Sequence, residues 1–353
     1  MGRPAAGTLV LNNYSESGIG DWGVSLLANL RQANPEIQEE TTIPRWSGFF
    51  RQILRILSHR GVLVANLGLT GWGSSGPRNL LGYAALGVRA KLRGHTVVLI
   101  HHVIEVLDLD TAGYRVSEVT RRGAQFAIEL LKSAQTVVFT GAIYDAVAQN
   151  YGFLPTAKLF LPCHRPRNRQ GGARGHPRIV TLGYIAPYKG IDLFIPTCER
   201  LGSDADGCII GSAHRVLSSI PESASAIQAV LNRAQHAGIK ITGRLSDDEL
   251  SDCLNSASLA LLSYRSSSGG SAAFATLAES CLPVVASRLP TFVELEETGA
   301  GVVLCEPSPD VFADTIRKLL TDERAMSDLR ERQRRYAEDH SWDRFVRELS
   351  KLC

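Results

Sequence analysis

The sequence predicts an α/β protein made of two doubly wound domains that face each other across a cleft. Its 353 residues are enough for two domains of ordinary size. Short β-branched and apolar runs alternate with helical patterns, which is typical of βαβ units around a parallel sheet. A stretch rich in Pro, Gly and Arg, residues 163–177, separates these runs into two groups. We therefore expect two Rossmann-like halves joined by a linker.

The expected strands are apolar on both faces, as in parallel sheets covered by helices on each side. The sequence places them at 8–13, 61–68, 95–102, 136–141 and 158–162 in the first half, and at 178–185, 207–212, 239–243, 259–264, 283–287 and 301–305 in the second. Helical patterns fill most of the intervals. The predicted organisation is an N-terminal domain over 1–165, a linker over 166–177 and a C-terminal domain from 178.

Composition excludes several classes of protein. The formal net charge of +3 is too small and too dispersed to indicate a nucleic-acid partner. The seven cysteines lack C-x-x-C spacing, so they predict neither a zinc site nor a disulfide framework, and they fit a reducing compartment. No signal-peptide pattern or membrane-spanning apolar run occurs. We expect a cytoplasmic protein that binds no nucleic acid.

A Gly/Ser loop, "RSSSGGS" at 265–271, connects the expected strand 258–264 to an alanine-rich helix. Doubly wound sheets bind ligands at such carboxyl-terminal strand ends. Free amides in the first turn of a helix, together with the helix dipole, favour an anion such as phosphate. The alternative is an ordinary N-capped helix, and the loop by itself does not decide between them.

The turn "GYIAPYKG", residues 183–190, places Lys189 and a glycine between the first strand of the second half and its helix. A flexible ammonium group at this position can reach a phosphate held by the Gly/Ser loop. By itself Lys189 is better explained as a solvated surface lysine. Two anion-suited turns in one half favour a phosphate or diphosphate ligand.

From residue 178 onward the chain resembles the nucleotide-sugar-binding half of GT-B glycosyltransferases of the retaining family four, also known as the family one group of glycosyl transferases. The matching pieces follow the family's order: "LGYIAPYKGIDLFI", "ITGRLSDDELSDCLNSASLALLSY", the Gly/Ser loop, "LAESCLPVVASRLPTFVELEETGAG" and "YAEDHSWDRF". The resemblance implies a C-terminal domain over 178–335 and a helix over 336–353 that crosses back to the first domain. It also implies a nucleotide diphospho-sugar donor whose diphosphate is held by Lys189, Ser267, Ser268, Gly269, Gly270 and Ser271.

The sequence departs from the family where two glutamates normally stand eight positions apart. Ser268 and Thr276 occupy those positions, and Tyr184 stands where an arginine usually accompanies the lysine. The shorter hydroxyl side chains still hydrogen-bond sugar hydroxyls, with less reach and no charge assistance. Glu279, one turn beyond Thr276, is assigned to the donor ribose, the alternative being an exposed helical glutamate.

In the first half, "NNYSESGIGDWG" at 12–23 predicts a glycine loop that leads into a helix. By resemblance, Gly18 and Gly20 approach the donor, and Asp21 accepts a hydrogen bond from an acceptor hydroxyl. The alternative is a plain strand-to-helix turn capped by Asp21.

His101 and His102 end the expected strand 95–102. The family has a His followed by an Asp there, so the resemblance makes His101 the catalytic residue that contacts the donor sugar, and His102 replaces the Asp. A histidine here can hydrogen-bond a sugar hydroxyl and order the reacting geometry. Two structural histidines at a strand end are the alternative.

The resemblance implies transfer with retention, without a protein nucleophile, metal or cofactor. The acceptor would attack the face from which the nucleotide diphosphate leaves. Two D-x-D strings, at 108–110 and 204–206, suggest the metal-dependent GT-A class, but we interpret them as loop acids because GT-A enzymes lack the "PYKG" strand.

Residues 45–61, "RWSGFFRQILRILSHRG", form an amphipathic basic helix with Trp46, Phe50, Ile53 and Leu57 on one face. One interpretation is peripheral contact with an anionic membrane at its inner face. The other is a helix that packs on its own sheet and turns a basic face to solvent.

The leading prediction is a hexosyltransferase-like enzyme of glycan biosynthesis. Its acceptor is a glycan, a lipid-linked sugar or a small molecule, which the sequence does not distinguish. Because both glutamates are absent, a degenerate GT-B protein that binds a sugar nucleotide or partner subunit without transfer is the alternative. A GT-B epimerase is a third possibility, although its catalytic acids are not evident.

Overall fold

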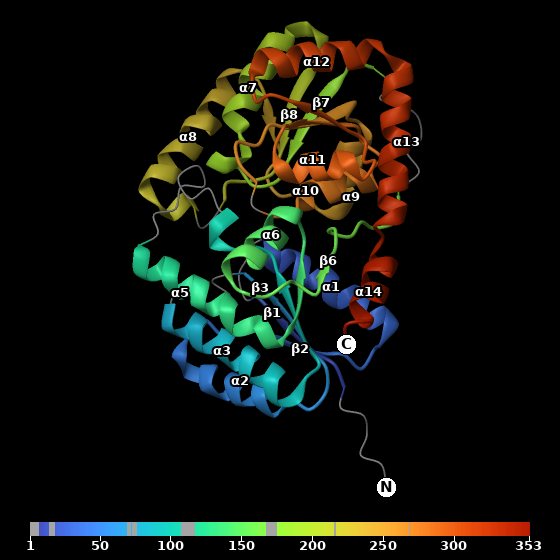
Figure 1. The fold of residues 1–353 in the computed structure, drawn as a ribbon. Coiled ribbons are helices and arrows are strands. Elements are labelled where there is room, and N and C mark those ends of the chain that lie inside the picture. The colour runs from blue at the N-terminus through green and yellow to red at the C-terminus, as the bar shows by residue number, and fades with distance from the viewer. Residues whose placement is uncertain are drawn as a thin grey trace.

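The computed structural model of the protein contains two parallel six-stranded sheets, each covered by helices on both faces (Figure 1). This arrangement confirms the predicted α/β class with two doubly wound halves. The structure describes residues 7–13, 18–68, 72, 76–106, 117–166, 175–214, 217–267 and 269–353.

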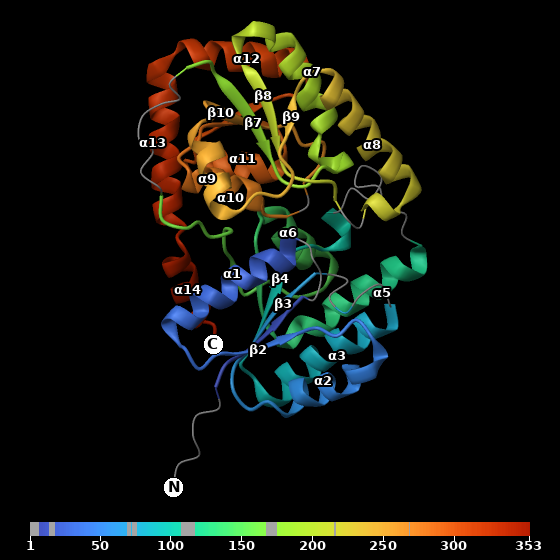
Figure 2. The same cartoon turned by 180° about the vertical axis from the view of Figure 1, so that it is seen from behind.

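The first sheet has the strand order β2-β1-β3-β4-β5-β6, with every pair parallel. Its strands are β1 (Leu9–Asn12), β2 (Gln38–Thr41), β3 (Leu63–Leu67), β4 (Thr96–Ile100), β5 (Gln135–Val138) and β6 (Ala157–Lys158). The helices of this half are α1 (Gly18–Ala33), α2 (Trp46–Ser58), α3 (Gly76–Arg93), α5 (Glu118–Glu129) and α6 (Gly141–Asn150). Helices α2, α3 and α5 lie side by side over one face (Figures 1 and 2).

The second sheet has the order β12-β11-β10-β7-β8-β9. Its strands are β7 (Arg178–Leu182), β8 (Asp206–Ile210), β9 (Lys240–Ile241), β10 (Leu259–Leu262), β11 (Val284–Ser287) and β12 (Val302–Cys305). The helices are α7 (Ile191–Leu201), α8 (Pro221–His236), α9 (Asp247–Asn255), α10 (Ala272–Glu279), α11 (Pro290–Glu297), α12 (Pro309–Thr321), α13 (Glu323–Asp339) and α14 (Trp342–Ser350).

The strands are buried on both faces because successive side chains point to opposite sides. In the second sheet Ile179 and Ile209 belong to the core under α7, α8 and α12. Their neighbours Val180 and Ile210 belong to the other core, which extends into the first half through Phe139, Leu161 and Trp342. The two halves therefore share one continuous apolar core.

Two strands differ from the prediction. Strand β2, "QEET", was not predicted because it is polar and mostly exposed, which suits an edge strand with a single neighbour. Strand β6 pairs only at Ala157 and Lys158, whereas the sequence suggested 158–162. Beyond β6, Leu161 packs instead against the interface between the halves.

Helix α2 packs on its sheet, but not by the face that carries Trp46 and Phe50. Its buried residues are Phe49, Gln52 and Ile56. Non-helical backbone at Ser47 and Gly48 turns the start of the helix. Gln52 tolerates burial because its amide is fully bonded: it accepts from Ile43 N and Trp72 Nε1 and donates to Thr41 O.

The chain crosses between the halves twice, at one place. Cys163 N donates to His340 O at 2.8 Å, and Trp342 N donates to Cys163 O at 3.0 Å. Beyond this crossing α14 lies on α1, where Trp342 stacks on Trp22 with 5.5 Å between ring centroids (Figure 1). The last helix thus belongs spatially to the first half.

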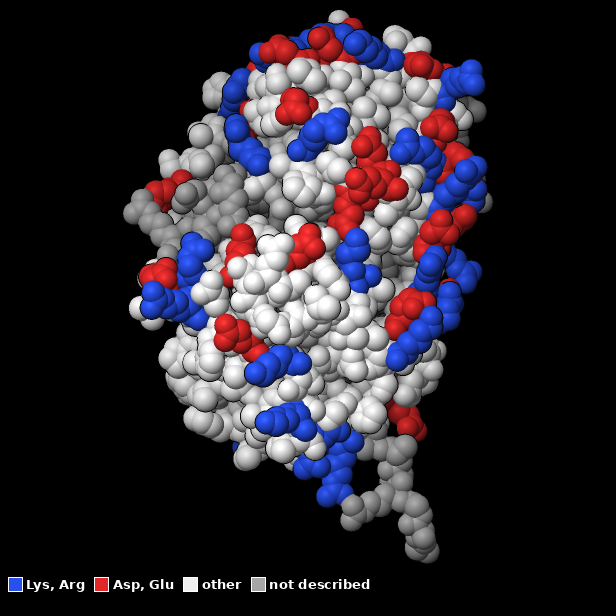
Figure 3. Space-filling view, viewed as in Figure 1, with Lys and Arg blue, Asp and Glu red and all other residues white. Residues whose placement is uncertain are grey.

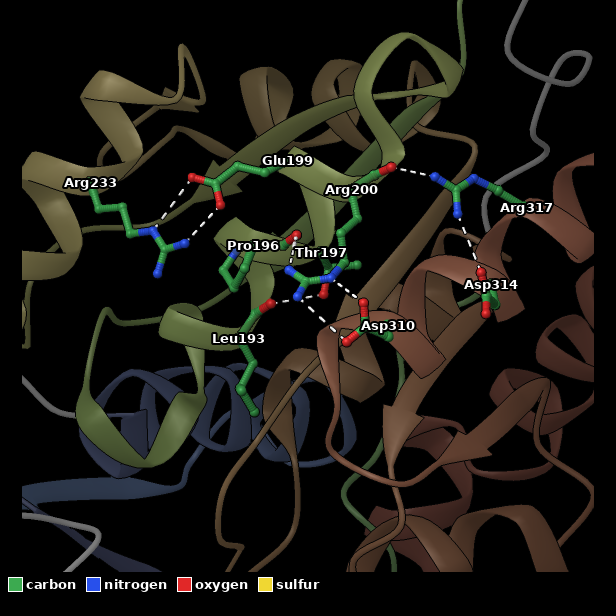
Figure 4. Close-up of polar contacts among 9 residues, drawn as sticks. All are labelled: Leu193, Pro196, Thr197, Glu199, Arg200, Arg233, Asp310, Asp314 and Arg317. Atoms are coloured by element: carbon green, nitrogen blue, oxygen red, sulfur yellow. Dashed lines mark hydrogen bonds and ion pairs between the residues drawn. The ribbon is translucent and has the colours of Figure 1, made fainter.

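An ion-pair network ties together the helices at the outer end of the second half (Figure 4). Arg200 of α7 pairs with Asp310 of α12, and Arg233 of α8 pairs with Glu199 at 2.7 Å. Arg317 bonds Asp204 at 2.8 Å. In the D-x-D string at 204–206, Asp204 is thereby engaged in the network, whereas Asp206 begins β8 and so is not a loop acid. The string at 108–110 lies outside the described residues.

Two helical glycines predict opposite changes in stability. A Cβ at Gly87 of α3 would lie 2.0 Å from the carbonyl oxygen of Leu130, whereas one at Gly123 of α5 meets nothing within 4 Å. We expect Gly87→Ala to lower the free energy of unfolding by about 2–3 kcal/mol through overpacking. Gly123→Ala should raise it by about 0.5–1 kcal/mol through helix propensity. Denaturant unfolding measures both, and equal effects of the two changes would contradict the packing of α3.

Candidate functional site

The turn that carries Lys189 is fixed on the end of strand β10. Gly190 has φ of +63°, and a Cβ there would lie 1.8 Å from the carbonyl oxygen of Ser263, so only glycine fits. Ser263 Oγ donates to Gly190 O at 2.7 Å, and Arg265 N donates to Tyr188 O at 2.9 Å. The "PYKG" segment is thus a rigid turn at the carboxyl edge of the sheet.

The Lys189 ammonium group contacts Tyr264, the residue that precedes the Gly/Ser loop. Nζ donates to the phenol oxygen of Tyr264 and lies 3.9 Å from the centre of its ring. Burial lowers the pKa of Lys189 and raises the pKa of Tyr264 to about 12, and Ser271 hydrogen-bonds the same phenol. In the part of the chain that the structure describes, Lys189 has no carboxylate as ion-pair partner.

The Gly/Ser loop reaches the first half. Cβ atoms at Gly269 and Gly270 would lie 2.7 Å from His101 O and from Leu161 Cγ, respectively, so both glycines permit close contact across the interface. Ser267 Oγ donates to Thr291 Oγ1 at 3.0 Å, and Ser271 Oγ caps α10 by accepting from Phe274 N. Ser268 lies outside the described residues.

The two predicted donor residues on α10 have other partners in this structure. Thr276 Oγ1 donates to Ala272 O within its own helix at 3.1 Å. Glu279 accepts from His164 N at 2.8 Å and so holds the segment that crosses from the first half. The structure does not bring either side chain to Lys189.

The first half contributes the start of α1 and the end of β4. Helix α1 begins at Gly18, and Gly20 lies in its first turn. Asp21 reaches across the interface: it accepts from Tyr184 OH at 3.2 Å and pairs with Arg244 at 3.4 Å. The residue assigned to the acceptor thus contacts the second half.

His101 is buried beneath this edge and belongs to a chain of polar side chains. Its ring stacks on Phe139 at 4.7 Å, and its Nε2 lies 2.6 Å from Asn66 Oδ1. Because Asn66 Nδ2 donates to Asn12 Oδ1, Asn66 Oδ1 is the acceptor and His101 must carry its proton on Nε2. Burial, with a smaller contribution from His102, lowers the pKa of His101 to about 3, so the ring is neutral.

The structure therefore gathers Lys189, Ser271 and the loop glycines at one edge, with His101 directly across the interface. Sequence reasoning missed Asn66, Arg244 and the position of His102, whose ring faces Gly269. Only Asn66 had a local signal, as a polar residue inside the apolar run 61–68. Across the described ranges, no three His, Cys, Asp or Glu side chains cluster as a metal site would require.

Residues 165–340 match the family model described as Glycosyl transferases group 1. The chain therefore belongs to the group 1 glycosyltransferases. Anabaena HepE, solved in complex with UDP, is 13% identical with a TM-score of 0.73, and the match covers 98% of each chain. Sucrose-phosphate synthase from Thermosynechococcus elongatus is 12% identical with a TM-score of 0.71, again over 98% of each chain. No curated protein matches the sequence.

These likenesses show that the glycosyltransferase shares the GT-B fold, as the sequence predicted. A third structure, a glycosyltransferase from Rickettsia africae, is 12% identical with a TM-score of 0.70 and covers 99% of this chain and 98% of its own. In the described parts of the glycosyltransferase, no helix has both the length and the apolar character needed to cross a membrane.

The burial of neutral His101 predicts a pH dependence of stability. In the unfolded chain this histidine takes up a proton near its usual pKa of 6.5, whereas in the folded chain it does so only near 3. The unfolded state therefore binds more protons between these values, and stability falls as the pH falls. Relative to His101→Phe, the wild type should lose up to about 1.4 kcal/mol of unfolding free energy per pH unit below pH 6.

Denaturant unfolding at a series of pH values measures this difference. His236→Phe is the matched control, because His236 is exposed on α8. Parallel stability curves for the wild type and His101→Phe would show that His101 is not buried in its neutral form.

Proposed function

We propose that the protein transfers a sugar, with retention of anomeric configuration and without a metal ion, from a nucleotide diphospho-sugar to an acceptor on the first domain. The observation that carries this proposal is the position of Lys189. Its ammonium group has no carboxylate partner among the described residues, and it bonds the phenol of Tyr264, which Ser271 at the start of α10 also hydrogen-bonds. A cation and the amino end of a helix at one strand edge suit a diphosphate.

The leaving diphosphate carries the charge that develops during transfer. Lys189 and the amides around Gly269, Gly270 and Ser271 are the groups we assign to that charge, so the chemistry needs no metal to stabilise it. Gly18 and Gly20 at the start of α1 approach the donor from the first half. Because these groups are held by the packed edges of two sheets, they require little rearrangement as charge develops.

His101 acts as a neutral hydrogen-bonding group in this proposal. Its Nε2–H is committed to Asn66, which leaves Nδ1 as the atom that accepts a hydrogen bond from a sugar hydroxyl. A ring fixed by Asn66 and Phe139 orients that contact without acting as a nucleophile. Retention then follows from attack on the face that the diphosphate leaves.

The donor is inferred from the ligands of solved structures with similar folds. HepE was solved with UDP and with UDP-glucose, so UDP-sugars are the first donors to test. Thr276 and Ser268 replace the family's acids, so the hydroxyl contacts of this donor site are neutral. We infer a donor preference different from that of enzymes with both glutamates. Binding without transfer remains the alternative outcome of the assay.

The function is tested by incubating the protein with UDP-, GDP- and ADP-sugars in the presence of EDTA. We expect release of nucleoside diphosphate, with water or an added sugar as acceptor, and a product whose first-formed anomer matches the donor by NMR. An inverted anomer would exclude retention, and dependence on added divalent metal would exclude metal-independent transfer. Tight donor binding with no turnover would support the degenerate binding protein.

Lys189→Ala should weaken UDP binding by about 1.5–3 kcal/mol, or roughly 10- to 150-fold, because it removes a charged partner of the diphosphate. Lys240→Ala is the matched control, since this exposed lysine begins β9 at the opposite edge of the sheet. Calorimetry with UDP measures both affinities. If Lys189→Ala binds UDP as well as Lys240→Ala does, the diphosphate site lies elsewhere.

We further propose that the protein contacts an anionic membrane through residues 45–61 and the two helices beside them. Large apolar side chains are exposed along α2, where Phe50 is 60% and Leu54 67% exposed. Neighbouring helices continue this apolar-basic face with Leu81, Val88 and Leu92 of α3 and Val119 and Phe126 of α5. Figure 3 shows broad uncharged areas on this side of the molecule, with Lys and Arg side chains and a few Asp and Glu side chains among them.

The positive charge of this face favours an anionic partner. Segments 45–61 and 76–93 contain no Asp or Glu, and they expose Arg45, Arg51, Arg55, Arg60, Lys91 and Arg93. Exposed aromatic and aliphatic side chains flanked by cations favour the interface of an anionic bilayer. A lipid-linked acceptor presented by that bilayer would then reach the first domain directly.

Vesicle co-sedimentation tests this contact. With vesicles of phosphatidylglycerol and phosphatidylcholine, we expect the double variant Phe50→Ser, Leu54→Gln to bind about tenfold more weakly, because it removes apolar area from the bilayer contact. Leu154→Gln is the matched control, since Leu154 is 68% exposed outside these helices. If the double variant binds vesicles as well as the wild type does, or if binding does not depend on anionic lipid, the proposed membrane contact is wrong. Loss of a dimer in the double variant would indicate a second copy instead.

A further inference from the structure

Two residues of the second half contact the carboxylate of Asp21, and a third packs against one of them. Tyr184 follows β7 and Arg244 follows β9, so both stand at the carboxyl edge that also carries Lys189. Tyr184 OH donates to one oxygen of Asp21, and Arg244 pairs with the other at 3.4 Å. His214, which follows β8, packs its ring on Tyr184 with 5.2 Å between centroids. The ends of β7 and β9 thus direct a hydroxyl donor and a cation at Asp21, and His214 from the strand between them packs on Tyr184.

The contact between Asp21 and Arg244 is open to solvent. The Arg244 side chain is 73% exposed and that of Asp21 is 44% exposed. An exposed pair of this kind is weak and exchanges partners readily. A phosphate group offers the same guanidinium two oxygens and more charge, so it competes well with a single carboxylate.

We propose that Arg244 is a second cation for the donor diphosphate, and that Asp21 holds it, together with Tyr184, until the donor displaces the carboxylate. This inference rests on the proposed function, because it assigns one more residue to the same donor site. Lys189 is fixed by the turn on β10, whereas Arg244 is a long exposed side chain that is free to move when its partner changes. The donor would then release Asp21 for the acceptor, so that the acceptor binds second.

The two partners are predicted to have opposite effects on donor affinity. If the ion pair were merely structural, removing either partner would break the same contact and shift affinity in the same direction. If Asp21 competes with the diphosphate for Arg244, Asp21→Asn strengthens UDP binding and Arg244→Gln weakens it. This difference in sign separates a donor-binding residue from a structural one.

The experiment is calorimetric titration of the full chain with UDP and with uridine. We expect Arg244→Gln to weaken UDP binding about 3- to 5-fold and Asp21→Asn to strengthen it about 2- to 5-fold, the range for an exposed charged contact. Uridine, which lacks the diphosphate, should bind all variants alike. Arg233→Gln is the matched control, because Arg233 forms a similar exposed ion pair with Glu199 at the outer end of the domain (Figure 4).

The outcomes distinguish this inference from the function it rests on. If the wild type binds UDP but both variants shift affinity in the same direction, or neither does, Arg244 is not a donor residue and the proposed function stands. If the wild type binds no UDP, GDP or ADP, both proposals fail together. Melting temperatures of the variants confirm that each one is folded, and an equal shift for uridine would overturn the assignment to the diphosphate.

Discussion

The packing of Trp22 is the interaction on which the arrangement of the two halves depends. This ring, on α1 of the first half, contacts Trp342 and Phe345 of the returning helix α14 and also His101 and Phe139. Aromatic pairs of this kind add to the apolar area that they bury. Trp22 therefore joins the C-terminal helix to the strand edge that carries His101. It is also the residue that follows Asp21 in the sequence.

The fold was largely predictable because both sheets rely on local patterns. Continuous apolar runs gave the central strands, since strands covered on both faces have no polar side. The polar edge strand β2 could not be read this way, because its stability comes from pairing with β1 and not from its own side chains. The burial of Gln52 was equally hidden, because its amide is satisfied by Ile43 and Trp72.

The candidate site was predictable only in part. Lys189 and the Gly/Ser loop each follow a recognisable strand, and parallel topology brings those strand ends to one edge. Asp21 pairs with Arg244 and Glu279 with His164, and both partners are distant in sequence. No motif spacing therefore predicts these contacts. Such contacts depend on the interface between the two domains. Sequence patterns indicate the fold of each domain but not the residues that meet at the interface.

The double crossing at Cys163 and Trp342 also has a mechanical consequence. Both covalent connections between the halves run through one pair of hydrogen-bonded segments. Because both connections lie side by side, the crossing defines an axis about which the halves can turn once their shared core and interface contacts open. Displacement grows with distance from an axis, and α5 and α8 lie on the opposite side of the molecule (Figures 1 and 2). A large molecule that enters between the halves would pass most easily on the side of α5 and α8.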